Sequence, residues 1–173
     1  PSGQLTPGAR AVLKEQIAEA RALSILMGYY DVHFNNYLID KAGRVWAFDA
    51  GLAVPKRPSF AAPNYISRFG QSANQDVQWA RNLREFRSHK GDEFVRRIDD
   101  LMDPASMHRA GERIKGMTDS QLSSIIDDAM PGHPDAAEVF RSLKARRDNF
   151  TEILGDRWPP PPSGPGAWLI PLE

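Results

Sequence analysis

The sequence predicts a mainly helical α+β fold that contains one small β-hairpin. Two short strand-like segments, residues 36–39 and 44–48, flank a turn that ends at Gly43. Elsewhere, apolar residues recur at helical spacing in residues 9–27, 75–87, 92–102 and 135–154. A chain of 173 residues is long enough for one hydrophobic core. We therefore expect one folded unit over residues 1–155 and a tail over residues 156–173, which holds six of the 14 prolines.

Local signals predict where several of the helices begin and end. Thr6 is placed to cap the first helix, with Pro7 at its first position and Gly28 after its last apolar residue. Asp103 followed by Pro104 marks the start of a shorter helix. The spacing of Thr118 and Gln121 predicts a capping box before the next one, and Gly155 ends the long helix over residues 135–154.

The charge distribution gives no sign of a nucleic-acid-binding or membrane-binding protein. Twenty-two basic residues balance 22 acidic residues, so no net field favours an anionic partner. We interpret the adjacent like charges as solvated helix faces, namely Arg96–Arg97, Asp99–Asp100, Asp127–Asp128 and Arg146–Arg147. The chain has no cysteine, no apolar run long enough for a transmembrane segment and no signal-peptide pattern at its start. These features predict a soluble domain.

The polar residues around the hairpin point to phosphoryl transfer. Asp31 is followed by His33, by Asn36 five positions after Asp31, and by Asp49 thirteen positions after Asn36. Phosphoryl transfer requires a carboxylate near the attacking hydroxyl and oxygen ligands for Mg²⁺. Asp31 suits the first role, and Asn36 and Asp49 suit the second because Mg²⁺ prefers oxygen ligands. The hairpin would bring Asn36 and Asp49 to one edge, and Gly51 would allow a tight metal-binding loop.

These motifs, Asp-x-His-x-x-Asn-x-Leu and then Gly-x-x-Trp-x-x-Asp-x-Gly-Leu, resemble a known family. They are similar to the C-terminal lobe of the phosphatidylinositol 3-/4-kinase-like superfamily, including its small bacterial members, and more distantly to HipA-type toxin kinases. The resemblance implies an ATP- and Mg²⁺-dependent kinase. It assigns Asp31 and His33 as catalytic and Asn36 and Asp49 as metal ligands at the nucleotide site, together with Gly51. The acceptor would be a lipid headgroup or a protein hydroxyl.

The segment before the motif lacks the parts of a kinase N-terminal lobe. A complete kinase carries a loop over the phosphates and a lysine that contacts them. Only 30 residues precede Asp31, and they predict one helix whose single lysine is Lys14. We therefore expect a C-terminal lobe whose missing N-lobe comes from the rest of a longer polypeptide or from a partner chain. A bacterial toxin or effector, acting in the cytoplasm of its own cell or of a target cell, fits this arrangement.

Other interpretations of these residues compete with a kinase. Asp and Asn at this spacing also occur in ordinary turns, where they bond to their own backbone. His33 equally suits a structural role, because the sequence shows no partner for its ring. The same lobe could serve as a non-catalytic, pseudokinase-like interaction module. A metal-dependent hydrolase that uses Asp31, His33 and Asp49 would bind a divalent metal without any nucleotide.

Overall fold

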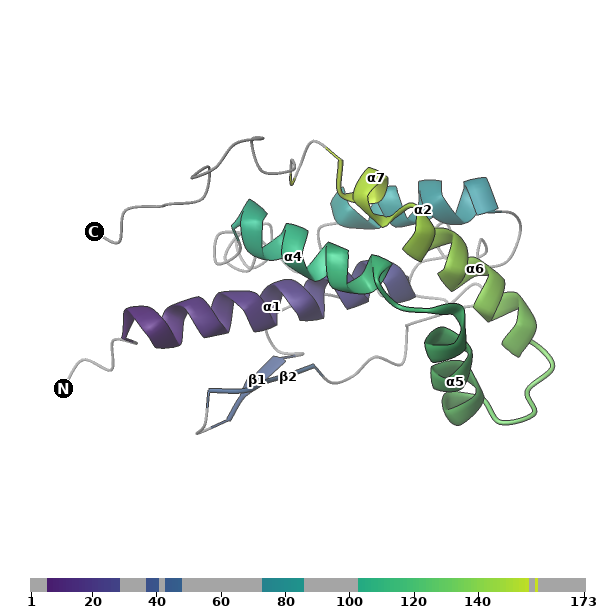
Figure 1. The fold of residues 1–173 in the computed structure, drawn as a ribbon, viewed down its shortest axis with the longest axis horizontal. Coiled ribbons are helices and arrows are strands. Elements are labelled where there is room, and N and C mark those ends of the chain that lie inside the picture. Colours follow the sequence, from purple (N-terminus) through teal and green to yellow (C-terminus); the bar gives the residue numbers. More distant parts are fainter. Residues whose placement is uncertain are drawn as a thin grey trace, which may run out of the picture.

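In the part of the chain that the computed structural model describes, six helices pack together, and a two-stranded hairpin lies beside the first of them (Figure 1). The structure describes residues 6–28, 37–40, 43–47, 73–85, 103–155 and 158. The strands are β1 (Tyr37–Ile39) and β2 (Val45–Ala47). The helices are α1 (Pro7–Met27), α2 (Ala73–Glu85), α4 (Pro104–Lys115), α5 (Asp119–Ala129), α6 (Ala136–Asp148) and α7 (Phe150–Leu154). The predicted mainly helical fold with one small hairpin is confirmed.

The predicted helix boundaries hold where a specific cap was identified. The Thr6 hydroxyl accepts a hydrogen bond from the Ala9 amide at 3.2 Å. At the other end of α1, Gly28 adopts a left-handed conformation with φ 74°, which glycine reaches without strain. Asp103 caps α4 through a 2.7 Å bond from the Ser106 amide. The capping box of α5 is also present.

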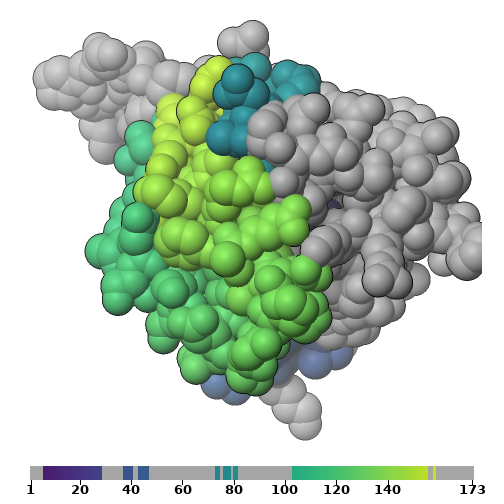
Figure 2. Space-filling view, turned by 90° about the vertical axis from the view of Figure 1, so that its right-hand side faces the viewer, coloured from purple at the N-terminus to yellow at the C-terminus, as the bar shows by residue number. Residues whose placement is uncertain are grey.

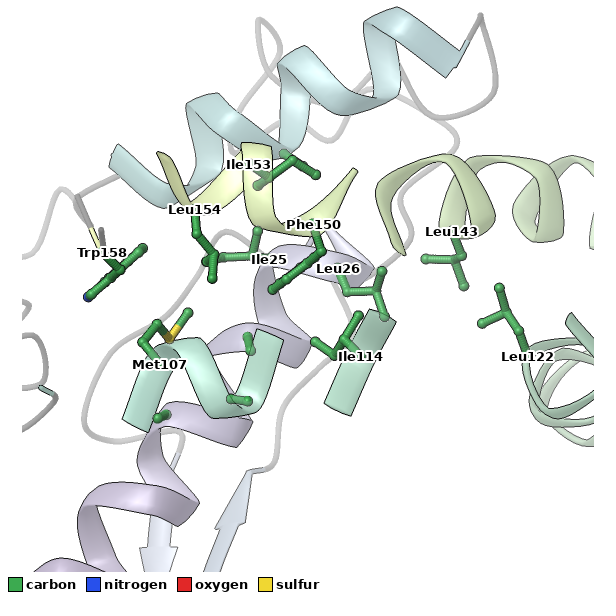
Figure 3. Close-up of a cluster of buried hydrophobic side chains, with 14 of the residues drawn as sticks. Ile25, Leu26, Met107, Ile114, Leu122, Leu143, Phe150, Ile153, Leu154 and Trp158 are labelled. Atoms are coloured by element: carbon green, nitrogen blue, oxygen red, sulfur yellow. The ribbon is translucent and has the colours of Figure 1, made fainter. Parts of the chain in front are cut away.

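The core lies where α1, α4 and α7 meet, and it extends to α5 and α6 (Figure 3). Short residues on α1, including Ala18 and Ala22, are fully buried and allow the neighbouring helices to approach closely. Figure 3 shows the larger side chains that fill the remaining space: Ile25, Leu26, Met107, Ile114, Leu122, Leu143, Phe150, Ile153, Leu154 and Trp158. Among the described segments, none of the helices combines the length and the apolar character needed to span a lipid bilayer.

The prediction of one continuous helix over residues 135–154 is wrong, because this region forms two helices. α6 ends at Asp148 and α7 begins at Phe150, with Asn149 between them at φ −106° and ψ 17°. The Asn149 side-chain amide donates to the Ala145 carbonyl at 2.8 Å. A side chain that bonds to the helix backbone competes with the regular ladder, which explains the break.

Two large apolar residues of the helices are exposed rather than buried. Leu23 is 45% exposed and Ile125 is 53% exposed, although both fall on apolar stripes. In α1 the buried face is centred on Ala18, Ala22 and Ile25, so the small residues rather than Leu23 mark the contact. The predicted helix over residues 92–102 lies outside the described residues, and so does the tail predicted over residues 156–173, apart from Trp158.

Gly111 marks the closest approach of α4 and α7. A Cβ atom at this position would lie 2.9 Å from Leu154 Cδ1 and 3.4 Å from Phe150 Cδ1. Both side chains are buried and have little room to move. We therefore expect Gly111→Val to lower the free energy of unfolding by about 1–3 kcal/mol in urea titration, through overpacking. Gly8→Ala is the control: Gly8 has no atom within 4 Å of an added Cβ, so this change should stabilise α1 by up to about 1 kcal/mol.

Candidate functional site

The predicted hairpin is present, and its register is defined by three residue pairs. Tyr37 lies opposite Ala47, Leu38 opposite Trp46 and Ile39 opposite Val45. The turn is closed by the Gly43 amide, which donates to the Asp40 carbonyl at 2.9 Å. Gly43 has φ 79°, which explains the glycine at the end of the turn. The second strand begins at Val45 rather than at Arg44, and the predicted outer-end residues 36 and 48 lie outside the described residues.

All five predicted site residues lie outside the described residues: Asp31, His33, Asn36, Asp49 and Gly51. The structure does describe the strands that precede or follow them. Asn36 is bonded directly to Tyr37, and Asp49 comes two residues after Ala47. Because Tyr37 and Ala47 are paired, both chain segments are attached to the same end of the hairpin.

Gln16 on α1 binds the outer edge of β2. Its side-chain nitrogen donates to the Gly43 carbonyl at 3.3 Å, and its oxygen accepts from the Val45 amide at 2.7 Å. An amide side chain carries one donor group and one acceptor, so it can pair with a strand edge as a neighbouring strand would. This role could not be predicted from the residue type, since a glutamine on a helix is usually solvated. Gln16 thereby fixes the hairpin to α1.

Tyr37 makes a second contact between the hairpin and α1. Its hydroxyl shares a hydrogen bond with the Ser24 hydroxyl, which itself donates to the Ala20 carbonyl at 2.8 Å. Burial raises the pKa of the Tyr37 phenol, while the Ser24 bond and the positive charge of Arg21 act in the opposite direction. A neutral tyrosine at this position ties the open end of the hairpin to the last turn of α1.

The last turn of α1 is bound by a buried polar cluster, which consists of Asp76, Ser142, Arg146 and the Leu26 carbonyl. Arg146 Nη1 donates to the Leu26 carbonyl at 3.0 Å. Arg146 Nη2 lies 3.8 Å from Asp76 Oδ1, and the Ser142 hydroxyl donates to Asp76 Oδ2 at 2.8 Å. Both charged side chains are 0% exposed. The cluster therefore joins α1, α2 and α6 inside the protein.

Arg146 keeps its charge at neutral pH despite its burial. Burial lowers the pKa of the guanidinium to about 10, and the negative charge of Asp76 opposes this shift. A pKa of about 10 still leaves the group protonated at pH 7. Figure 2 shows the face of the molecule on which α5, α6 and part of α2 lie. Both charged side chains of the buried pair are 0% exposed. The pair is an internal one.

The prediction that Arg146 and Arg147 form a solvated face is wrong. Arg147 is 5% exposed and donates to the Met117 carbonyl at 3.0 Å and to Asp119 at 2.5 Å. Successive residues on a helix point about 100° apart, so each arginine contacts a different neighbouring helix. Asp127 and Asp128 are exposed as predicted, whereas Arg96–Arg97 and Asp99–Asp100 lie outside the described residues.

The spacing of Arg146 in the sequence indicates that its side chain is buried. It lies three residues after Leu143 and four before Phe150, so it continues the apolar stripe of that region. In the same way, Asp76 precedes Ala80 by four residues on the buried side of α2. A single charge on an apolar stripe indicates a buried, paired group, because isolated charges are costly to bury.

Asp40, the acidic residue of the hairpin turn, is occupied by hydrogen bonds within the turn. Asp40 accepts hydrogen bonds from the Arg44 amide at 3.0 Å, from Arg44 Nε at 2.7 Å and from the Trp46 indole at 3.2 Å. These contacts give Asp40 a structural role in the turn. Within the described ranges, no three His, Asp or Glu side chains lie close enough together to hold a metal ion.

Comparisons with protein-family models, with curated proteins and with solved structures give no significant match. The structure itself defines the class of protein as mainly helical, with one small antiparallel hairpin held against its first helix.

Proposed function

We propose that this chain is the C-terminal lobe of an ATP- and Mg²⁺-dependent phosphotransferase. Asp31 would orient or deprotonate the acceptor hydroxyl, and His33 would assist at the transferred phosphate. Asn36 and Asp49 would hold Mg²⁺ beside the nucleotide, and Gly51 would allow the backbone to close around it. The observation that carries the proposal is the hairpin register, which attaches the chain segments of Asn36 and Asp49 to one end of the same hairpin.

The register matters because the two proposed ligands come from different strands. A slip of one residue in a hairpin turns every side chain of that strand to the other face. Here the turn at Gly43, the contact of Gln16 with β2 and the contact of Tyr37 with α1 all fix the same register. The oxygen ligands that Mg²⁺ prefers are thus attached to a hairpin of defined geometry.

In the proposed reaction, an acceptor oxygen attacks the γ-phosphorus of ATP and the bond to the β-phosphate oxygen breaks, which releases ADP. The acceptor proton passes to Asp31. Mg²⁺, when bound, neutralises the charge on the phosphates during transfer. The acceptor is a hydroxyl of a lipid headgroup or of a protein. The nucleotide-clamping loop and lysine come from an N-lobe, supplied by a longer polypeptide or by a partner chain.

The proposal is tested by calorimetric titration of ATP, with and without Mg²⁺. The titration is made into the chain alone and into the chain extended by any upstream coding segment. We expect Mg²⁺-dependent binding that weakens at least tenfold in Asp49→Ala. Asp128→Ala is the matched control: it removes an exposed carboxylate on α5, so its affinity should stay at the wild-type value. An absence of Mg²⁺-dependent binding in every combination would overturn the proposal.

An interaction module is the second candidate, and the outer surface of the hairpin favours it. Leu38 is 57% exposed and its cross-strand partner Trp46 is 53% exposed, so their side chains lie on the same face of the hairpin. The Arg44 guanidinium lies over the Trp46 ring, 5.6 Å from its centre. Exposed aromatic and aliphatic groups of this kind occur at protein interfaces. Failure of the nucleotide titration would leave this function as the better account.

A further inference from the structure

The two ends of the segment 29–36 are held at the same end of α1. Before the segment, Leu26 is bound through its carbonyl by Arg146 at 3.0 Å, and Gly28 closes the helix with bonds to the Ile25 and Ser24 carbonyls. After the segment, Tyr37 bonds to Ser24, one turn earlier on the same helix. The described contacts thus fix both points from which this stretch of chain, which carries Asp31 and His33, departs.

Arg146 provides a hydrogen-bond donor for the C-terminal end of α1. The last four carbonyls of an α-helix have no donor within the helix, and Leu26 contributes one of them. A guanidinium provides a directed donor for this carbonyl, and its positive charge interacts favourably with the negative end of the helix dipole. Arg146 therefore caps the C-terminus of α1 from a different helix.

The other members of the cluster hold Arg146 in place. Asp76 on α2 faces the guanidinium at 3.8 Å, and Ser142, one turn before Arg146 on α6, donates to Asp76 at 2.8 Å. A buried ion pair is a poor source of stability, because apolar residues of similar volume often stabilise a core as well or better. What an apolar residue cannot provide is a hydrogen bond that fixes the direction in which α1 ends.

We infer that Arg146 is a positioning residue, which sets the last turn of α1 and so the point from which the chain enters the segment 29–36. Asp76 and Ser142 keep its guanidinium oriented toward the Leu26 carbonyl. The catalytic meaning of this positioning rests on the proposed function, whereas the structural effect on the end of α1 does not.

The test replaces the polar cluster by apolar residues in one variant, Asp76→Leu/Ser142→Ala/Arg146→Met. Hydrogen–deuterium exchange is followed by mass spectrometry on the peptide that covers residues 22–28, the end of α1 and its cap. We expect the midpoint of urea unfolding to stay near that of the wild type, while exchange in this peptide becomes at least tenfold faster. Ile126→Val on α5 is the control, because it trims a buried residue of the core that is not part of the cluster. It should leave the exchange of this peptide within about twofold of wild type.

Unchanged exchange in the apolar variant would overturn the inference. So would unprotected exchange of this peptide in the wild-type chain, because Arg146 would then hold no ordered helix end. Ser142→Ala alone is the second variant, should the triple variant not fold; it retains both charges and should give a smaller increase in the same peptide. No change there would likewise overturn the inference. Failure of the wild-type chain to bind ATP with Mg²⁺ would count against the proposed function alone.

Discussion

Replacement of Asp76 by alanine is expected to lower the free energy of unfolding by about 3–5 kcal/mol, which is the usual cost of removing one partner of a buried ion pair. The reason is the charge that remains. Arg146 is 0% exposed, and its pKa of about 10 keeps it protonated at neutral pH. Without the Asp76 carboxylate, that positive charge loses the negative charge that faces it. The Ser142 hydroxyl loses the oxygen to which it donates as well.

Urea unfolding monitored by circular dichroism at pH 7 measures this effect. The decisive comparison is with the apolar variant Asp76→Leu/Ser142→Ala/Arg146→Met, in which no charge remains to be buried. Its stability should return to within about 1.5 kcal/mol of wild type, because well-packed apolar groups can replace a buried pair. If the triple variant were as unstable as Asp76→Ala, the loss would come from packing rather than from the unpaired charge.

A matched surface variant separates burial from the loss of an ion pair in general. Glu152 on α7 pairs with Arg81 on α2 and is 59% exposed at its side chain. Glu152→Ala also breaks a contact to α2, but exposed ion pairs contribute only about 0–1 kcal/mol. The difference between the two alanine variants is therefore the effect of burying the charge. Equal losses would contradict the burial of Asp76 and Arg146.

The local signals in the sequence predicted helix ends and the hairpin turn correctly. Thr6, Gly28 and Gly43 each act on residues within one turn of themselves, so no tertiary information is needed to interpret them. The break at Asn149 shows where such reasoning fails. Asparagine inside an apolar stripe is compatible with a continuous helix, and only its bond to Ala145 in the folded chain shows that the helix ends there.

The contacts that organise the candidate site could not be predicted from the sequence. Gln16 and Ser24 are ordinary polar residues of a helix, and their partners on the hairpin are set by how α1 and the hairpin pack. Arg146 carried a signal in its spacing, but nothing in the sequence identified Asp76 as its partner. The predicted chemistry of Asp31 and Asp49 came from residue types and separations, and it remains a prediction.

Phe150→Ala is the second change with a large expected effect, a loss of about 3–5 kcal/mol in the free energy of unfolding. Phe150 is 0% exposed and lies at the centre of the core, where Figure 3 shows it between α1 and α4. Its ring contacts the position of Gly111 on α4 so closely that an added Cβ there would lie 3.4 Å away. The neighbouring helices have little freedom to close the cavity that alanine would leave.

α7 is especially dependent on this side chain because it is short. A helix of five residues has no stability of its own in water, so its packing decides whether it forms. Phe140→Ala on α6 is the control: Phe140 is only partly buried at the edge of the same core, and its loss should cost less than half as much. Comparable losses in urea titration would mean that Phe150 is not the central contact of α7.

The effect of Phe150→Ala on stability should be coupled to that of the buried polar cluster. α7 packs against α2 as well as α4, and α2 carries Asp76. If Phe150 holds α7 in place, then Phe150→Ala combined with Asp76→Ala should cost less than the sum of the two single changes, since each loosens the same helix. Strict additivity in that double-mutant cycle would show that the apolar core at α7 and the buried ion pair are independent supports of α2.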